Sequence, residues 1–291
     1  MTPTPDGRGS GADGEGAGAG GPAPPSADGE GATPTGAVSV TVDGSVATVV
    51  LRRPPHNLLT VPILGALADA VHGLGDDVRV AVVASDGRSF CAGADFRSGN
   101  APDPSDGGSF AVQTAAFYAQ AARLYESPVP LVAAVQGGAI GAGFGLALAC
   151  DLRVVGAGAW FQASFVRLGI HPGFALSAVL PAVIGPARTA DLFLTARRME
   201  ADEALAVGMA HRLVPAGEEL AAAGALAEQV AAGAPLAVAA TRATMRRGLG
   251  ASVRATMRQE LARQSALAGT EDAREGVRAA LEGRAPRFVG R

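Results

Sequence analysis

One long uncharged stretch constrains this chain more than any other feature. Residues 131–149 carry no charged side chain and include five glycines from Gly137 to Gly145. The length would suit a membrane helix, but each glycine costs a helix about 1 kcal/mol. Pro128 and Pro130 also favour an extended approach to the stretch. The pattern therefore predicts a buried strand at 131–135, a glycine loop at 136–141, a helix at 142–150 and a second strand at 152–155.

A glycine loop that opens a helix aims free backbone N–H groups at whatever lies in front of it. Phosphate is one candidate, but the pattern G-x-G-x-x-G from Gly141 fails at Leu146, and the lysine of a P-loop is missing. The other candidate is an oxyanion on an acyl group, for which one N–H donor contributes about 3–4 kcal/mol in the transition state. A second donor is available at Gly93 and Ala94, in GRSFCAGADF.

The composition excludes several classes of protein. A net charge of −3 without basic runs leaves no electrostatic footprint for nucleic acid. Because the chain has no lysine, Schiff-base and pyridoxal chemistry on a lysine are excluded. Cys91 and Cys150 lie in separate apolar segments, which is typical of free thiols in a reduced compartment. We therefore expect a cytoplasmic protein that binds neither nucleic acid nor a membrane.

Three segments of different composition follow one another along the chain. Residues 1–36 are rich in Gly, Ala, Pro, Asp and Ser and lack apolar periodicity, which predicts a disordered tail. Residues 37–217 alternate strand and helix patterns and begin with a hairpin at Asp43-Gly44. Residues 218–291 show helical periodicity alone, to about Leu281. The chain is therefore predicted to be an α/β core at 37–217 followed by a helical region at 218–291.

Several ordered motifs carry a family resemblance. They are FCAGADF (90–96), VAAVQGGAIGAGFGLALACDLRV (132–154), LGIHPG (168–173), TARRMEADEALAVGMAHRLVP (195–215) and TEDAREGVRAALEGRAPRF (270–288). In these motifs the chain resembles the enoyl-CoA hydratase/isomerase, or crotonase, superfamily from about residue 37 to its end. The resemblance implies a crotonase-like α/β spiral of repeated ββα units, with a C-terminal helical region that packs across subunits of a homotrimer or homohexamer. It also implies an acyl-CoA thioester as substrate, with coenzyme A as part of that substrate, and neither a further cofactor nor a metal.

The resemblance also implies roles for particular residues. The thioester carbonyl is expected between the backbone N–H groups of Ala94 and Ala142. Ala142 replaces the family's usual glycine, which is tolerable where φ is negative. A segment that holds the coenzyme A adenine and ribose in relatives contains His56 and Asn57. The remaining substrate-binding residues implied are Asp95, Phe96, Arg97, Gly138, Gly141 and Phe165.

The chain departs from the family pattern at the two glutamates with which hydratases add water. The first glutamate belongs four residues before the Leu-Ala-Cys-Asp end of the helix, and this position is Gly145. The second belongs four residues before the first glycine of LGIHPG, and this position is Phe165. Neither residue can transfer a proton. His171 is the best remaining candidate for acid–base work, because the LGIHPG loop borders the acyl pocket in the family. The alternative role for His171 is a pocket-wall or capping residue.

Two classes of function remain open on the sequence. The first is an enzyme that stabilises a thioester enolate or tetrahedral intermediate. Hydratase or isomerase is the family default, whereas a decarboxylase, hydrolase or C–C lyase is easier to reconcile with the missing glutamates. The second class is a non-catalytic acyl-CoA-binding protein. Turnover of an acyl-CoA panel, measured against binding of the same panel, would separate the two classes.

Overall fold

A computed structural model of the chain describes residues 36–291. The tail predicted at 1–36 therefore lies, except for Gly36, outside the described residues. The largest element is a six-stranded sheet in the order β1-β2-β3-β4-β6-β9. Its first pair is the hairpin predicted from the sequence, antiparallel and closed at Gly44, where φ is 54°. The strands are β1 (Val38–Asp43), β2 (Val46–Leu51), β3 (Val80–Ser85), β4 (Leu131–Val135), β6 (Leu152–Gly156) and β9 (Arg212–Val214).

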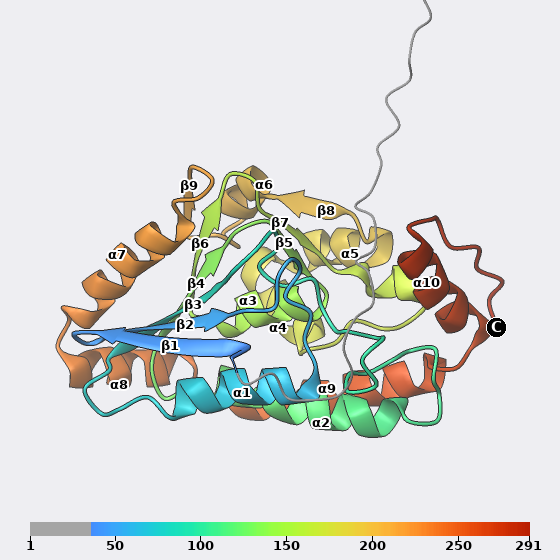
Figure 1. Cartoon of the computed structure of the whole chain (residues 1–291), viewed down its shortest axis with the longest axis horizontal. Coiled ribbons are helices and arrows are strands. Elements are labelled where there is room, and N and C mark those ends of the chain that lie inside the picture. Colours follow the sequence, from blue (N-terminus) through green and yellow to red (C-terminus); the bar gives the residue numbers. More distant parts are fainter. Residues whose placement is uncertain (1–35) are drawn as a thin grey trace, which may run out of the picture.

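From β2 onward the strands of this sheet are parallel, and both of its faces are covered. Successive side chains of a strand point to opposite faces. In β3, for example, Val80 and Val82 belong to a cluster with helix α7 (Glu219–Ala231), whereas Ala81 and Val83 belong to the main core. Figure 1 shows α7 on one face of the sheet. Burial on both faces explains the continuous apolar runs in the sequence.

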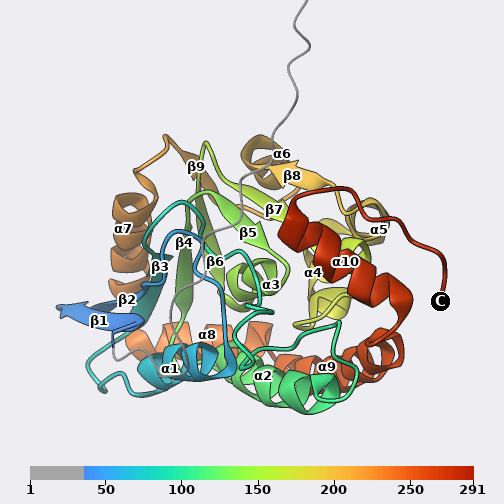
Figure 2. The same cartoon turned by 45° about the vertical axis from the view of Figure 1, so that its right-hand side comes forward.

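A second, three-stranded sheet lies over the centre of the molecule. Its order is β5-β7-β8, formed by β5 (Gly138–Ile140), β7 (Trp160–Gln162) and β8 (Arg198–Glu200). The glycine loop predicted at 136–141 is therefore wrong in part, because residues 138–140 form a strand. This strand pairs with β7, which is distant in sequence, so no local periodicity in the sequence indicates it. Helix α3 (Ala142–Ala149) begins directly after β5, and Figure 2 shows it between the two sheets.

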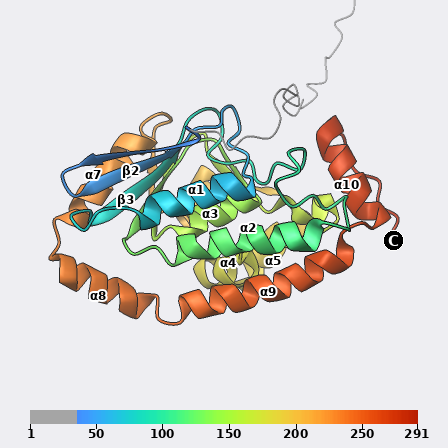
Figure 3. The same cartoon turned by 60° about the horizontal axis from the view of Figure 1, so that its bottom comes forward.

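Three long helices form a layer beneath the main core. They are α1 (Val61–His72), α2 (Phe110–Tyr125) and α9 (Leu249–Leu267), and Figure 3 shows them side by side. Thr60 caps α1, because its hydroxyl accepts the N–H of Ile63. The other helical elements, apart from α3 and α7, are η1 (Ser164–Leu168), α4 (Leu176–Ile184), α5 (Pro186–Thr195), α6 (Ala201–Ala206), α8 (Pro235–Met245) and α10 (Glu271–Glu282).

This architecture confirms the predicted fold class. Strand pairs followed by a helix recur along the chain, as in β4-β5-α3, and helices alone follow β9. The division at residue 217 stays a prediction, and α7, which follows it, packs on the main sheet. Between residues 36 and 291, no single helix combines the length and apolarity of a membrane span. Helices α7 and α8 pass such a test only as a pair, and they meet at 105°.

Candidate active site

Two loops that are distant in sequence are joined at the amino end of α3. The N–H of Cys91 donates to the carbonyl of Gly138, and the N–H of Ile140 donates to the carbonyl of Cys91. Helix α3 can approach this closely because Gly143 has no side chain: a Cβ there would lie 1.9 Å from the Cys91 carbonyl oxygen. The residues after Cys91 are thereby fixed against the first turn of α3.

The backbone N–H groups of Ala94 and Ala142 are brought together by this arrangement. A Cβ built on Gly93 would lie 3.9 Å from the Ala142 nitrogen. Within residues 36–291, neither amide has a backbone or side-chain acceptor. Ala142 is the first residue of α3 and is not among the residues with positive φ, so an alanine fits there without strain. Two unpaired donors at a helix N-terminus suit an oxyanion.

The two amides face a cavity of about 800 Å³. Gly141, Phe96 and Phe165 line it, and the two aromatic residues contribute apolar surface; their role in substrate binding stays a prediction. Gly138 lies behind the wall instead, where a Cβ would lie 2.9 Å from the ring of Trp160, itself a lining residue. A cavity of this size, mostly apolar and with a few polar groups, suits a small-molecule ligand.

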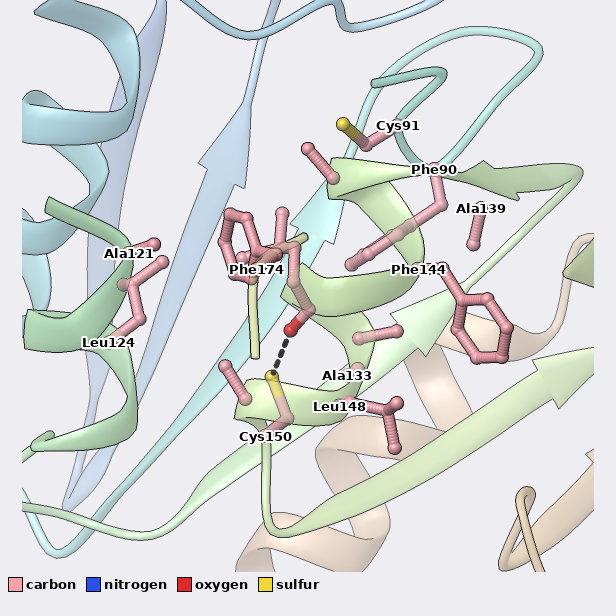
Figure 4. Packing of buried hydrophobic residues seen from close by; sticks show 14 of the residues in the cluster. Phe90, Cys91, Ala121, Leu124, Ala133, Ala139, Phe144, Leu148, Cys150 and Phe174 are labelled. Atoms are coloured by element: carbon pink, nitrogen blue, oxygen red, sulfur yellow. Dashed lines mark hydrogen bonds between the residues drawn. The ribbon is translucent and has the colours of Figure 1, made fainter. Parts of the chain in front are cut away.

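At Gly145, where the family resemblance places the first hydratase glutamate, the space for a side chain is filled by Phe174. A Cβ on Gly145 would lie 2.4 Å from Cδ1 and 2.6 Å from Cγ of Phe174. Figure 4 shows Phe174 beside α3, on the other side of that helix from the ring of Phe144. Phe174 is fully buried and packs edge-on against Phe117, with 6.1 Å between the ring centroids. The chain therefore has no room for a side chain at position 145.

Phe165 stands where the family resemblance places the second glutamate, and a phenylalanine cannot transfer a proton. Phe165 lines the cavity, and its ring approaches Gly141, with 3.8 Å between Cζ and a Cβ built there. Among the described residues, no aspartate or glutamate lines the cavity. A carboxylate from elsewhere in this part of the chain therefore does not replace the missing pair.

Four of the residues expected to bind substrate lie beside the cavity rather than in its lining. Asp95 is buried, and its carboxylate pairs with Arg53 at 2.6 Å and with Arg97 Nε at 3.8 Å. Asn57 is fully buried, donates to the carbonyl of Ser89 and accepts the N–H of Arg53. His56 Nδ1 lies 3.4 Å from the hydroxyl of Ser89. These contacts hold residues 53–58 against the loop that carries Ala94.

His171 is half-buried next to the cavity but is not among its lining residues. Its Nδ1 lies 2.7 Å from the carbonyl oxygen of Pro172, the residue that follows it. That contact ties one ring nitrogen to the local backbone. The catalytic role of His171 stays a prediction.

Both cysteines are fully buried free thiols. Burial raises the pKa of each thiol to about 12, so neither is a thiolate at neutral pH. The Cys150 thiol donates to the carbonyl of Leu146, as Figure 4 shows. Over residues 36–291, no group of three or more His, Cys, Asp and Glu is arranged to hold a metal ion.

The sequence analysis missed three features of this site. The guanidinium carbon of Arg198 lies 3.8 Å from the ring centroid of Trp160, and both residues line the cavity. Gln264, from the C-terminal helical region, lines the cavity beside Tyr118. Glu260 is buried behind the cavity and accepts the N–H groups of Ala175 and Ser177. Only Trp160, the single tryptophan, offered a signal in the sequence.

Comparisons with known proteins identify the family. The family model described as enoyl-CoA hydratase/isomerase matches residues 41–291. Carnitinyl-CoA dehydratase of Proteus mirabilis is 36% identical over 263 residues, covering 87% of this chain and 98% of the relative. A probable enoyl-CoA hydratase of Rhodobacter capsulatus is 32% identical, covering 86% and 96%.

A solved structure extends the agreement to three dimensions. The enoyl-CoA hydratase of Mycobacterium avium subsp. paratuberculosis matches with a TM-score of 0.76 and 28% identity, over 88% of this chain and 100% of the other. The two proteins therefore share their fold over nearly the whole described chain. The chain belongs to the enoyl-CoA hydratase/isomerase family, the crotonase superfamily.

Proposed function

We propose that this protein is an enzyme that acts on a CoA thioester and stabilises an oxyanion with the N–H groups of Ala94 and Ala142. The observation that carries the proposal is that these two N–H groups have no acceptor within residues 36–291 and belong to residues that line a mainly apolar cavity of about 800 Å³. Relatives named for carnitinyl-CoA and enoyl-CoA support a thioester as substrate. The positive end of α3 would add to the stabilisation of the developing charge.

The reaction that fits this site forms the enolate without a protein base. In a decarboxylation, the bond between the α-carbon and the departing carboxylate breaks, and its electron pair becomes the enolate held by Ala94 and Ala142. Carbon dioxide leaves, and water then supplies the proton to the α-carbon. A hydrolase or C–C lyase also fits the site better than hydration, because Gly145 and Phe165 provide no acid–base pair.

A second candidate function is binding of acyl-CoA without chemistry. The observation in its favour is the cavity lining, which contains no carboxylate within residues 36–291. A protein of this kind would keep the two amide donors and the apolar pocket, and its role would be to hold or deliver the thioester.

A panel of CoA thioesters tests the proposal. It contains 2-enoyl, malonyl-type, β-keto and saturated members, and both turnover and affinity are measured for each. We expect hydration of a short 2-enoyl-CoA to be several orders of magnitude below that of an ordinary hydratase, because each missing acid–base group contributes about 10²–10⁴-fold. Turnover of another member supports the enzyme. Binding of several members with turnover of none supports the second candidate, and binding of none refutes both.

We also propose that the protein assembles as a homotrimer or homohexamer in the cytoplasm. Helix α8 has no buried residue in the single chain, and Leu236 and Met245 on it are 87% and 81% exposed. An exposed apolar pair on one helix is better covered by a second subunit. Light scattering coupled to gel filtration measures the assembly, and a monomer at micromolar concentration would contradict this inference.

A further inference from the structure

A buried polar cluster interrupts the otherwise apolar wall of the cavity. It consists of Tyr118 on α2, Gln264 on α9 and Thr114, one turn before Tyr118. All three line the cavity, and each is less than a tenth exposed, at 8%, 3% and 1%. Residues four apart share one face of a helix, so the hydroxyls of Thr114 and Tyr118 lie on the same side of α2.

The cluster is held in a fixed arrangement. The Tyr118 hydroxyl donates to Gln264 Oε1 at 2.7 Å, and Gln264 Nε2 donates to the carbonyl of His171 at 2.7 Å. The LGIHPG loop is packed directly on it, because a Cβ on Gly173 would lie 2.1 Å from the Tyr118 hydroxyl oxygen. Tyr118 and Gln264 are therefore positioned before any ligand arrives.

The cluster retains unused hydrogen-bonding capacity. A side-chain amide has two N–H groups, and Gln264 uses one of them within residues 36–291. The Thr114 hydroxyl has no partner in that part of the chain, and its oxygen lies just beneath the cavity surface, so its side chain must rotate slightly to meet a ligand. Buried polar groups are nearly always paired, so an unpaired group in a cavity wall points to a partner that arrives with the ligand.

The cluster suits a neutral oxygen better than an anion. Tyr118, Gln264 and Thr114 are all uncharged side chains. A carboxylate placed at the cluster would find no cationic partner there and would lose its hydration on burial. A hydroxyl or keto oxygen would instead accept the free N–H of Gln264 and, as a hydroxyl, exchange a hydrogen bond with Thr114. The arginines that line the cavity, Arg167, Arg198 and Arg284, belong to other elements.

We propose that Tyr118, Gln264 and Thr114 form a subsite for an oxygen atom on the acyl group, so that the substrate is a hydroxyacyl- or ketoacyl-CoA rather than a plain hydrocarbon thioester. This inference rests on the proposed function. It names the class of acyl group and adds three specificity-determining residues. Phe96, Phe165 and Ile170 would contact the hydrocarbon part of the same group.

Isothermal titration with hexanoyl-CoA and its 3-, 4- and 5-hydroxy and 3-keto derivatives tests the subsite. We expect at least one oxygenated thioester to bind about tenfold more tightly than hexanoyl-CoA. In Tyr118→Phe, Gln264→Leu and Thr114→Val, that ratio should fall towards one. Thr189→Val is the matched control, because it makes the same change as Thr114→Val at a buried threonine of helix α5 outside the cavity lining, and it should keep the ratio.

The possible results separate the subsite from the function on which it rests. Equal affinity for all five thioesters in the wild type refutes the subsite and leaves the proposed function in place. An unchanged ratio in folded Tyr118→Phe, judged by its melting temperature, also refutes the subsite. If no thioester binds more tightly than free coenzyme A, both the subsite and the proposed function are wrong.

Discussion

Gly145 and Phe174 should be strongly coupled, because the ring of Phe174 lies where a side chain at position 145 would stand. A Cβ on Gly145 would meet three Phe174 atoms at 2.4, 2.6 and 2.7 Å. An alanine in a helix interior normally gains about 1 kcal/mol over glycine. Overpacking a core costs about 1–3 kcal/mol, and the shortness of these contacts favours the upper end. We expect Gly145→Ala to lower the free energy of unfolding by about 2 kcal/mol.

The coupling is measured with a double-mutant cycle. Phe174→Gly removes all three contacting atoms, and its φ of 63° suits glycine. In that background Gly145→Ala should regain the ordinary stabilisation of about 1 kcal/mol. The coupling energy is then about 3 kcal/mol, at the upper end for residues in contact. Urea unfolding followed by circular dichroism, at one protein concentration, gives the four free energies.

A matched control isolates packing from helix propensity. Gly224 lies inside helix α7, and a Cβ there would have nothing within 4 Å. Gly224→Ala should therefore stabilise the protein by about 1 kcal/mol. If Gly145→Ala behaves like Gly224→Ala, or has the same effect with and without Phe174, the steric reasoning about position 145 is refuted.

Three further predictions concern the site, a buried carboxylate and the tail. Ala142→Pro removes one amide donor at a helix position that tolerates proline, so it should lower turnover about 10²–10³-fold. Ala142→Gly keeps the donor and should have a mild effect. Wild-type rates in a folded proline variant would contradict the oxyanion assignment. Burial raises the pKa of Glu260 from 4.5 to about 7, so its stabilising contribution is complete below pH 4.5 and is lost as pH rises to about 7, by up to about 3 kcal/mol. In urea titrations at several pH values, Glu260→Gln should remove this loss of unfolding free energy with rising pH. Burial lowers the pKa of His211 to about 4, which has the opposite effect, but this effect is the same in both proteins and cancels in the comparison. An equal pH dependence in the two proteins would contradict the prediction. Deletion of residues 1–35 should leave the melting temperature and assembly unchanged, and a marked loss in either would show that the tail is packed.

The parts of the fold that have a local sequence signal could be predicted. The hairpin at Asp43-Gly44 and the limits of the strand at 131–135 are those observed. The hairpin follows from its turn residues, and the continuous apolar residues of the strand reflect burial on both faces. The pairing of the Ala94 and Ala142 amides could be anticipated too, because the family resemblance places both at the thioester carbonyl.

The parts of the site that depend on distant contacts could not be predicted. Strand β5 exists because residues 138–140 pair with β7 and with Cys91, neither of which is close in sequence. Gln264 reaches the cavity from α9, and its surroundings in the sequence resemble any exposed helix. The positive φ of Phe174, which points its ring at Gly145, is rare for a bulky residue and has no signature in a single sequence.

Several elements fix the surroundings of position 145, so placing the two glutamates that the family resemblance implies at 145 and 165 requires more than two changes. Phe174 and Ala175 have φ of 63° and 61°, and the turn is held by Glu260 through the N–H of Ala175 and by the Tyr125 hydroxyl through the carbonyl of Phe174. A glutamate at position 145 would collide with the ring that this turn presents.

Gly145→Glu/Phe165→Glu should therefore misplace its first carboxylate and hydrate crotonyl-CoA poorly, whereas Gly145→Glu/Phe165→Glu/Phe174→Gly should hydrate it about 10²-fold faster, the lower bound for one positioned acid–base group. Loss of absorbance of the 2-enoyl thioester measures both. Equal rates in the two folded variants would mean that Phe174 does not block the site, and that the ring moves aside at little cost.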